Sequence, residues 1–223
     1  MTYLVTGANR GLGLAFARGL AGRGDRVIAT ARRPEEAKAL AALPVRVETL
    51  DVADDSSIEA LARALSGEPV DVLINNAAIG EAGPGIARVK PEDLERAIRV
   101  NATGPLVVTQ ALLPNLRAGR RRLVVNLSSG LASISGNDSG GWSVYRASKA
   151  ALNQLTRTFA AELAGEGFTF ILISPGWVRT DMGGPGAPLS PDESVAAMLK
   201  VLDRLGPKDT GRFYDQRGKQ VPW

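Results

Sequence analysis

The 223-residue sequence contains no cysteine and no histidine. Without these residues the chain cannot form a Ser-His-Asp or Cys-His nucleophile system. It also cannot form a disulfide, or a zinc site built from imidazole or thiolate ligands. Any acid–base chemistry must therefore use tyrosine, lysine, aspartate, glutamate or bound water, and we expect no metal centre.

Aromatic residues and unbalanced charge are also scarce. Aromatics make up 5% of the chain, and 27 Lys and Arg stand against 23 Asp and Glu. A nucleic-acid site would need several basic clusters with aromatic platforms between them, so we expect no nucleic-acid partner. The basic cluster that is present is typical of a solvated loop; it consists of Arg117, Arg120, Arg121 and Arg122.

Long apolar runs are missing as well. No run approaches the roughly 20 residues of a membrane span, so we expect no membrane partner. Tyr3-Leu4-Val5 already has the pattern of a strand, which leaves no room before it for a signal or transit peptide. The absence of cysteine agrees with a reducing compartment. We therefore expect a cytoplasmic protein.

What the chain does contain is a regular alternation of short apolar runs and stretches with helical periodicity. The runs predicted as strands are 3–5, 26–31, 45–49, 70–74, 123–127 and 168–173, with 211–214 as an edge strand. The predicted helices are 12–21, 34–41, 56–65, 91–117, 143–164 and 190–205. This alternation is typical of a parallel sheet covered on both faces. The sequence predicts one doubly wound, Rossmann-type α/β domain over residues 1–223, with a seven-stranded, mainly parallel sheet.

A glycine-rich turn, Thr6-Gly7-Ala8-Asn9-Arg10-Gly11-Leu12-Gly13, lies directly between the first predicted strand and the first predicted helix. Glycines there let the backbone approach a pyrophosphate, whose charge lies at the amino end of the helix. A tight turn without any ligand would use similar glycines. The position between strand and helix, within an alternating pattern, favours a dinucleotide site.

Tyr145 and Lys149 are four residues apart in a predicted helix, so their side chains project from the same face. A phenol normally has a pKa of about 10, and a neighbouring ammonium lowers that pKa by favouring the phenolate. An exposed helix pair without a chemical role would have the same spacing. The upstream glycine-rich turn favours a catalytic role.

With these two features the chain resembles the classical short-chain dehydrogenase/reductase family. Further segments match the motifs of that family in the same order: Asp51-Val52, Asn75-Asn76-Ala77-Ala78, Asn101, Asn126-Leu127-Ser128-Ser129 and Pro175-Gly176-Trp177-Val178-Arg179-Thr180. Segments 140–149, 176–184 and 221–223 are similar to the C-factor-like branch of its carbonyl reductases. That branch includes proteins discussed as developmental signals.

The resemblance implies that Tyr145 donates a proton to a substrate carbonyl oxygen while a nicotinamide supplies hydride. Lys149 would hold the nicotinamide ribose and lower the pKa of Tyr145. Ser129 would hydrogen-bond the carbonyl oxygen, and Asn101 would order a water that resupplies the proton. Ser129 is preferred to Ser128 because it occupies the last position of the matching motif. The spacing from Ser129 to Tyr145 exceeds the family's usual spacing by about three residues, which predicts a small insertion between them.

The family motifs also imply the cofactor contacts, which are Gly7, Asn9, Arg10, Gly11, Leu12, Gly13, Arg32, Asp51, Val52, Asn75, Ala77, Tyr145, Lys149, Pro175, Gly176, Val178 and Thr180. Segment 28–33 lacks the acidic residue with which NAD-preferring relatives bind the ribose 2′-hydroxyl. Arg32 can instead bind a 2′-phosphate through two donors, and Arg10 could approach it from the other side. We therefore expect NADP(H) in preference to NAD(H), the alternative being that Arg32 and Arg33 are solvated loop residues.

These features predict an NADPH-dependent enzyme that reduces an aldehyde or ketone. A short substrate lid would lie at about 177–191, and an apolar pocket would be formed by Leu131, Ile134, Trp142, Trp177 and Met182. The family resemblance also implies that helices 91–117 and 143–164 pair in a homodimer or homotetramer. Two alternatives remain open on the same fold: a nucleotide-binding signalling or redox-sensing protein without turnover, and an isomerase or epimerase.

Overall fold

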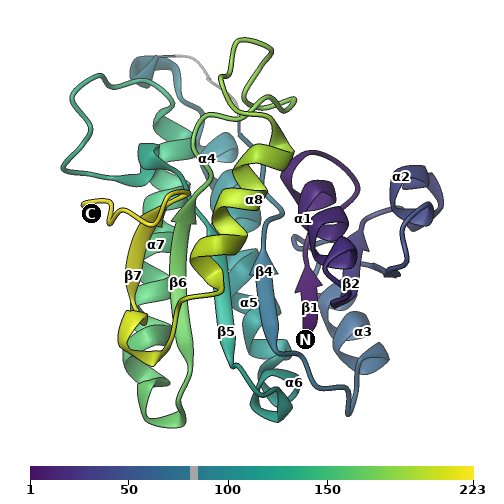
Figure 1. Cartoon of the computed structure of the whole chain (residues 1–223). Coiled ribbons are helices and arrows are strands. Elements are labelled where there is room, and N and C mark those ends of the chain that lie inside the picture. The colour runs from purple at the N-terminus through teal and green to yellow at the C-terminus, as the bar shows by residue number, and fades with distance from the viewer. Residues whose placement is uncertain (81–84) are drawn as a thin grey trace.

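In the computed structural model, which describes residues 1–80 and 85–223, seven strands form one sheet (Figure 1). Its order is β3-β2-β1-β4-β5-β6-β7, and all six pairings between these strands are parallel. The predicted sheet is therefore confirmed. The strands are β1 (Thr2–Val5), β2 (Arg26–Ala31), β3 (Arg46–Thr49), β4 (Val72–Asn75), β5 (Leu123–Leu127), β6 (Thr169–Ser174) and β7 (Arg212–Asp215).

Helices cover both faces of the sheet because successive strand residues point to opposite sides and both sets are apolar. Tyr3 and Val5 of β1 pack toward α1 (Gly11–Gly22) and α8 (Pro191–Leu202). Leu4, between them, packs into the cluster on the other face. The helices there include α3 (Asp55–Ala64), α5 (Gly104–Ala111), α6 (Leu113–Ala118) and α7 (Ser143–Glu162).

The helix predicted over 91–117 is interrupted. It consists of α4 (Pro91–Ile98), a π-helical turn (Arg99–Thr103), α5 and α6. Pro105 explains part of this, because it has no N–H to donate to the carbonyl four residues earlier. The helix predicted over 34–41 likewise becomes a 3₁₀ turn (Pro34–Glu36) followed by the short α2 (Lys38–Ala41). The other 3₁₀ turns are Ile86–Arg88, Gly130–Ala132, Ala164–Glu166 and Pro207–Asp209.

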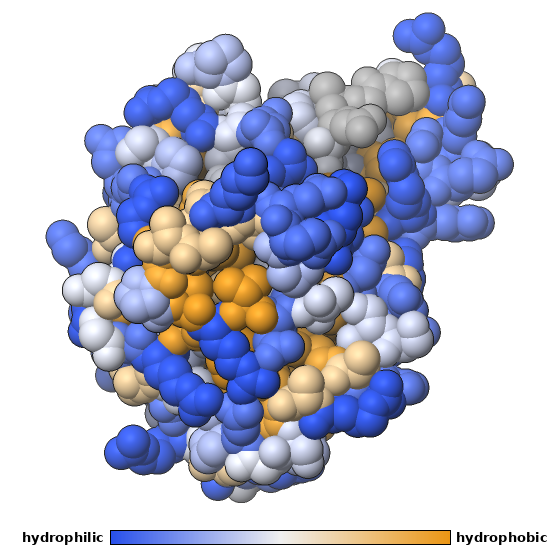
Figure 2. Space-filling model, turned by 90° about the vertical axis from the view of Figure 1, so that its right-hand side faces the viewer, coloured by the Kyte–Doolittle hydropathy of each residue, from blue (hydrophilic) through white to orange (hydrophobic). Residues whose placement is uncertain are grey.

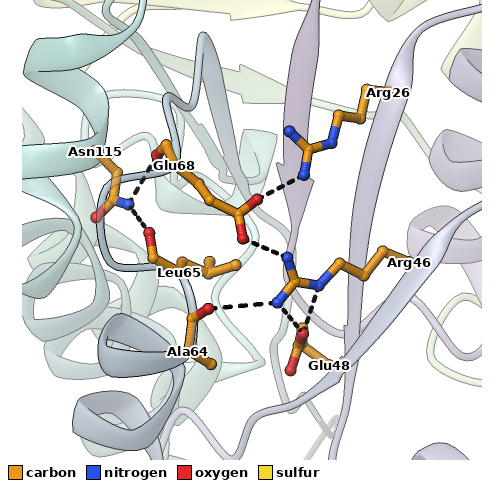
Figure 3. A network of polar contacts seen from close by, with 7 residues as sticks. All are labelled: Arg26, Arg46, Glu48, Ala64, Leu65, Glu68 and Asn115. Atoms are coloured by element: carbon orange, nitrogen blue, oxygen red, sulfur yellow. Dashed lines mark hydrogen bonds and ion pairs between the residues drawn. The ribbon is translucent and has the colours of Figure 1, made fainter.

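A charged network ties the amino ends of β2 and β3 to the segment after α3 (Figure 3). The Glu68 carboxylate accepts one hydrogen bond from Arg26 and one from Arg46, the first residues of those strands. The Asn115 side chain donates to the backbone carbonyls of Leu65 and Glu68. Because the strands are parallel, this network lies at the opposite end of the sheet from their carboxyl ends, so its role is structural.

Figure 2 shows the side of the molecule that carries α2 and the β3 edge, where apolar surface is limited to patches among charged side chains. Within the described residues, no helix combines the length and apolar character needed to cross a bilayer. The arginine cluster is only partly the solvated loop we expected. Arg117 pairs with Glu166, and Arg121 donates to the Leu202 carbonyl at the end of α8.

Candidate active site

The glycine-rich turn between β1 and α1 has a backbone that side chains would not tolerate. Gly7 and Gly11 have φ values of +65° and +54°, the left-handed region that favours glycine. A Cβ at Gly13 would lie 2.3 Å from the Gly7 carbonyl oxygen, so α1 can begin against the turn only because this residue is glycine. The result is an open cradle of backbone at the amino end of α1, which is suited to a phosphate group.

A cleft of about 1440 Å³ runs from this turn across the carboxyl ends of the strands. Figure 1 shows these strand ends at the top. The cleft is at the location at which parallel α/β sheets bind ligands. The structure brings most of the predicted site residues together there: Gly7, Asn9, Arg10, Gly11, Leu12, Arg32, Asp51, Val52, Ala77, Ser129, Tyr145, Lys149, Pro175, Gly176, Val178 and Thr180 all line the cleft.

Three predicted site residues do not line the cleft: Gly13, Asn75 and Asn101. Asn75 is buried, and its Nδ2 donates to Asn126 at 2.8 Å and to Thr109 at 3.2 Å. Its neighbour Asn76 lines the cleft instead and donates to the carbonyl oxygens of Thr6 and Gly7. The two asparagines differ because Asn75 is the last residue of β4 and its side chain points into the protein interior, whereas Asn76 lies just beyond the strand.

Tyr145, on the first turn of α7, is 9% exposed and faces the cleft. Burial raises the pKa of its hydroxyl to about 12, while a hydrogen bond with the Ser129 side chain acts in the opposite direction. The phenol is therefore protonated at neutral pH and can donate its proton. The ring of Trp142 meets the Tyr145 ring edge-on, with 5.9 Å between the ring centroids.

Lys149 lies one helical turn further along α7. Its Nζ donates a 2.8 Å hydrogen bond to the Leu127 carbonyl and lies 6.0 Å from the centroid of the Tyr145 ring. Burial lowers the pKa of Lys149 to about 7. The expected lowering of the Tyr145 pKa by Lys149 is therefore absent from this structure, since burial dominates the pKa of Tyr145 and weakens the charge of Lys149.

Ser128 and Ser129 have different surroundings. The Ser128 hydroxyl is buried and donates to Asn153 Oδ1 at 2.7 Å. The Ser129 hydroxyl is close enough to Tyr145 to affect its pKa, and it accepts a 3.2 Å hydrogen bond from the Leu131 backbone. Ser129 is therefore the serine that can contact the same substrate atom as Tyr145.

Asn101 is fully buried in the π-helical turn. Its carboxamide exchanges hydrogen bonds with the Ile79 backbone, at 2.9 and 2.8 Å, and donates to the Ser148 hydroxyl. The side chain is thus occupied. Any water that Asn101 holds would therefore have to contact its backbone rather than its side chain.

The opposite end of the cleft is cationic. Arg32 lines it, and within the described residues no carboxylate lies within ion-pair distance of this guanidinium. Arg33 pairs with Glu36 instead. Arg10 forms an exposed ion pair with Asp181 of the predicted lid, so a phosphate at Arg10 would compete with that carboxylate.

Sequence reasoning missed other residues in this part of the cleft. Arg96 and Val100, four residues apart on α4 and the π-helical turn, line the cleft together. Their spacing of four residues could have predicted that they share one face of a helix. It could not have predicted that α4 packs against the segment after β3. Arg99 makes that contact by donating to the Ala53 carbonyl at 3.1 Å.

The predicted apolar pocket forms around Tyr145, with one exception. Leu131, Trp142, Trp177 and Met182 line the cleft, whereas Ile134 is 78% exposed and does not. Gly80 closes the pocket tightly, because a Cβ there would lie 2.8 Å from Tyr145 Cδ2 and 2.9 Å from Met182 Sδ.

The chain is similar to several known proteins. The family model described as short chain dehydrogenase matches residues 1–187. The chain is 48% identical to C-signal of Myxococcus xanthus over 155 residues, which are 70% of this chain and 93% of that protein. Among solved structures, the NADPH-bound carbonyl reductase from chicken fatty liver superposes with a TM-score of 0.92 at 36% identity, covering 100% of this chain and 98% of that one. The carbonyl reductase Sniffer of D. melanogaster gives 0.94 at 30% identity, covering 100% and 99%.

Proposed function

Because the chain belongs to the short-chain dehydrogenase/reductase family, we propose that it reduces an aldehyde or ketone to an alcohol with NADPH as the cofactor. The observation that carries this proposal is the placement of Tyr145, Ser129 and Lys149 together in a cleft that begins at the glycine cradle. A phenol, a hydroxyl and an amine at that position have no evident use in a protein that only binds nucleotides.

The residues present fit a dinucleotide. Gly7 and Gly11 give the turn its left-handed backbone, Gly13 lets α1 begin directly against it, and the amino end of α1 favours a pyrophosphate. Asp51 and Val52 would hold the adenine end, and the 175–180 turn the nicotinamide end. When bound, the dinucleotide supplies hydride, chemistry that no side chain of this chain provides.

The chain itself handles the proton. Tyr145 would donate its phenolic proton to the substrate oxygen as negative charge develops there, and Ser129 would hold that oxygen by a hydrogen bond. Lys149 lies close enough to this centre to stabilise the phenolate that remains. A water ordered by Asn101 would resupply the proton to Tyr145.

Preference for NADPH over NADH is part of the proposal. Arg32, with no carboxylate partner within the described ranges, suits a dianionic 2′-phosphate, and Arg10 can reach the same region if it leaves Asp181. The similar carbonyl reductase from chicken fatty liver has NADPH bound in its crystal structure.

The test is a panel of aldehydes and ketones, followed by loss of NADPH absorbance with the wild-type protein. Turnover that disappears in Tyr145→Phe supports the proposal. A second candidate, a signalling protein that binds nucleotide without turnover, is favoured by the 48% identity to C-signal. Tight NADPH binding without turnover of any carbonyl in the panel would favour that second function.

A further inference from the structure

Arg146, directly after Tyr145, organises the loop between β5 and α7. Its guanidinium donates to three backbone carbonyls of this loop, those of Leu131, Gly140 and Gly141, and to the Ser139 hydroxyl, at 2.9 to 3.2 Å. These partners lie at both ends of the loop. The Arg146 side chain therefore joins the segment that follows Ser129 to the segment that precedes α7. The N–H groups in these four hydrogen bonds all donate to residues of the loop.

A second contact holds the middle of the loop. The Ser135 backbone N–H and hydroxyl both donate to the Trp223 backbone oxygen, at 2.9 and 2.6 Å. The Trp223 ring packs against Phe213 of β7 and lies 5.7 Å from the Arg157 guanidinium. Arg146 thus fixes one side of the loop and Trp223 the other. Figure 1 shows the C-terminus close to this loop.

The residue presented by this loop is Trp142. Its φ of 52° and ψ of 32° are left-handed, a conformation that residues with a Cβ rarely adopt, and it follows Gly140 and Gly141, which have positive φ as well. A residue with a Cβ keeps this strained backbone conformation only where the surrounding structure holds it there, and such residues are common at ligand sites. Here it turns the indole ring edge-on to the ring of Tyr145 within the cleft.

The charged side chains around this part of the cleft are already engaged. Arg179 donates to the carbonyls of Ala187 and Pro188, and Asp181 pairs with Arg10. Lys149 is buried and bonded to Leu127. Among the described residues, and apart from the Ser129 hydroxyl, the side chains that line this part of the cleft include four that are apolar: Leu131, Trp142, Trp177 and Met182. Trp177 is 59% exposed and Met182 36%, an unusual amount of apolar surface to leave in water.

We propose that Trp142, held in place by Arg146, forms the wall against which an uncharged aromatic aldehyde or ketone binds. This inference rests on the proposed function and narrows its substrate class. Arg146 acts through the loop and is a positioning residue, whereas Trp142 contacts the substrate. A flat, neutral ring matches the indole face and requires no charged partner.

The substrate test compares benzaldehyde with 4-carboxybenzaldehyde in the wild-type protein. The para-carboxylate has little electronic effect on the reactivity of the carbonyl, so a lower rate reports on binding. We expect kcat/KM at least about tenfold higher for benzaldehyde, the cost of placing an unpaired charge on apolar surface. Equal values, or a preference for the carboxylate, would overturn the substrate class.

The positioning test uses Arg146→Gln, with Arg63→Gln on α3, an exposed arginine that does not line the cleft, as the matched control. Arg146→Gln should raise KM for benzaldehyde at least about fivefold and change kcat for propanal, which is too small to need the wall, less than twofold. It should also speed hydrogen exchange in residues 130–142. The control should change neither quantity. An equal loss of kcat on both aldehydes, or unchanged exchange, would overturn the role of Arg146.

A binding experiment distinguishes failure of this inference from failure of the proposed function. If no carbonyl is reduced, calorimetric titration of benzyl alcohol into the protein saturated with NADP⁺ decides the inference. Binding that is lost in Trp142→Ala supports the aromatic site, and absence of binding to the wild-type protein refutes it.

Discussion

The side-chain nitrogen of Lys149 donates a 2.8 Å hydrogen bond to the carbonyl of Leu127, the last residue of β5. The bond anchors α7 to the strand that leads to Ser129, and it fixes Lys149 beneath the protein surface. Burial then lowers the pKa of this lysine from 10.5 to about 7. A buried amine with such a pKa makes the stability of the cofactor-free protein depend on pH.

Lys149→Met should remove that dependence. Between about pH 7 and 10, the unfolded chain binds a proton at Lys149 that the folded protein releases, so the wild-type free energy of unfolding rises with pH. The slope from one proton is at most about 1.4 kcal/mol per pH unit. Urea unfolding of both proteins at about pH 7, 8 and 9 measures the difference. A difference that stays constant with pH would contradict the lowered pKa.

Tyr145→Phe should lower kcat by orders of magnitude and leave the affinity for the cofactor nearly unchanged. The substitution removes the proton donor but keeps the ring that packs against Trp142 and Gly80. Steady-state kinetics and fluorescence titration with NADPH separate the two effects. If the variant kept more than about a tenth of the wild-type kcat, Tyr145 would not be the general acid.

Arg32→Asp should reverse the cofactor preference. Charge-assisted hydrogen bonds contribute about 1.5–3 kcal/mol each, so the wild-type protein should prefer NADPH by at least about tenfold at low salt. A carboxylate at this position would repel the 2′-phosphate and accept hydrogen bonds from the 2′-hydroxyl of NADH. The measurement is kcat/KM for both cofactors. Equal values in the wild-type protein, or an unchanged preference in the variant, would place phosphate recognition elsewhere.

Gly13→Ala and Gly22→Ala should have opposite effects, although both residues belong to α1. The new Cβ at Gly13 would lie 2.3 Å from the Gly7 carbonyl, whereas nothing lies within 4 Å of one at Gly22. We expect Gly13→Ala to cost about 1–3 kcal/mol and to abolish NADPH binding. Gly22→Ala should gain about 0.5–1 kcal/mol from helix propensity. Thermal unfolding checks the stabilities, and equal shifts in Tm would refute the tight contact.

The protein should form a homodimer or homotetramer through α4, α5 and α7, as we expect from the resemblance of those helices to the pairing helices of the family. Light scattering at micromolar concentration should give at least twice the mass of one chain, 23.4 kDa. Leu155→Glu, a partly buried apolar position on α7, should reduce the mass toward that of one chain. A mass near 23.4 kDa for the wild-type protein would exclude this assembly.

The sequence predicted the strands well because each is a short run of apolar residues between glycine or helical signals. Helix continuity was predicted less well. The stretch 91–117 has one helical period throughout, yet it contains Pro105 and a π-helical turn at Arg99–Thr103. A proline inside a long apolar segment changes the backbone hydrogen bonding locally. The periodicity of apolar residues in the sequence gives no information about that change.

The sequence by itself determined the chemistry available to this protein. With no cysteine or histidine, acid–base work falls to tyrosine, lysine and carboxylates, and the spacing of Tyr145 and Lys149 follows from helix geometry alone. Tertiary structure decided which polar groups are free to act. Asn75 and the Asn101 side chain are used inside the fold, and the Ser128 hydroxyl is bonded to Asn153 whereas the Ser129 hydroxyl contacts Tyr145. It also decided the pKa values of Tyr145 and Lys149, because burial depends on segments that are far apart in the chain and meet only when the sheet is assembled.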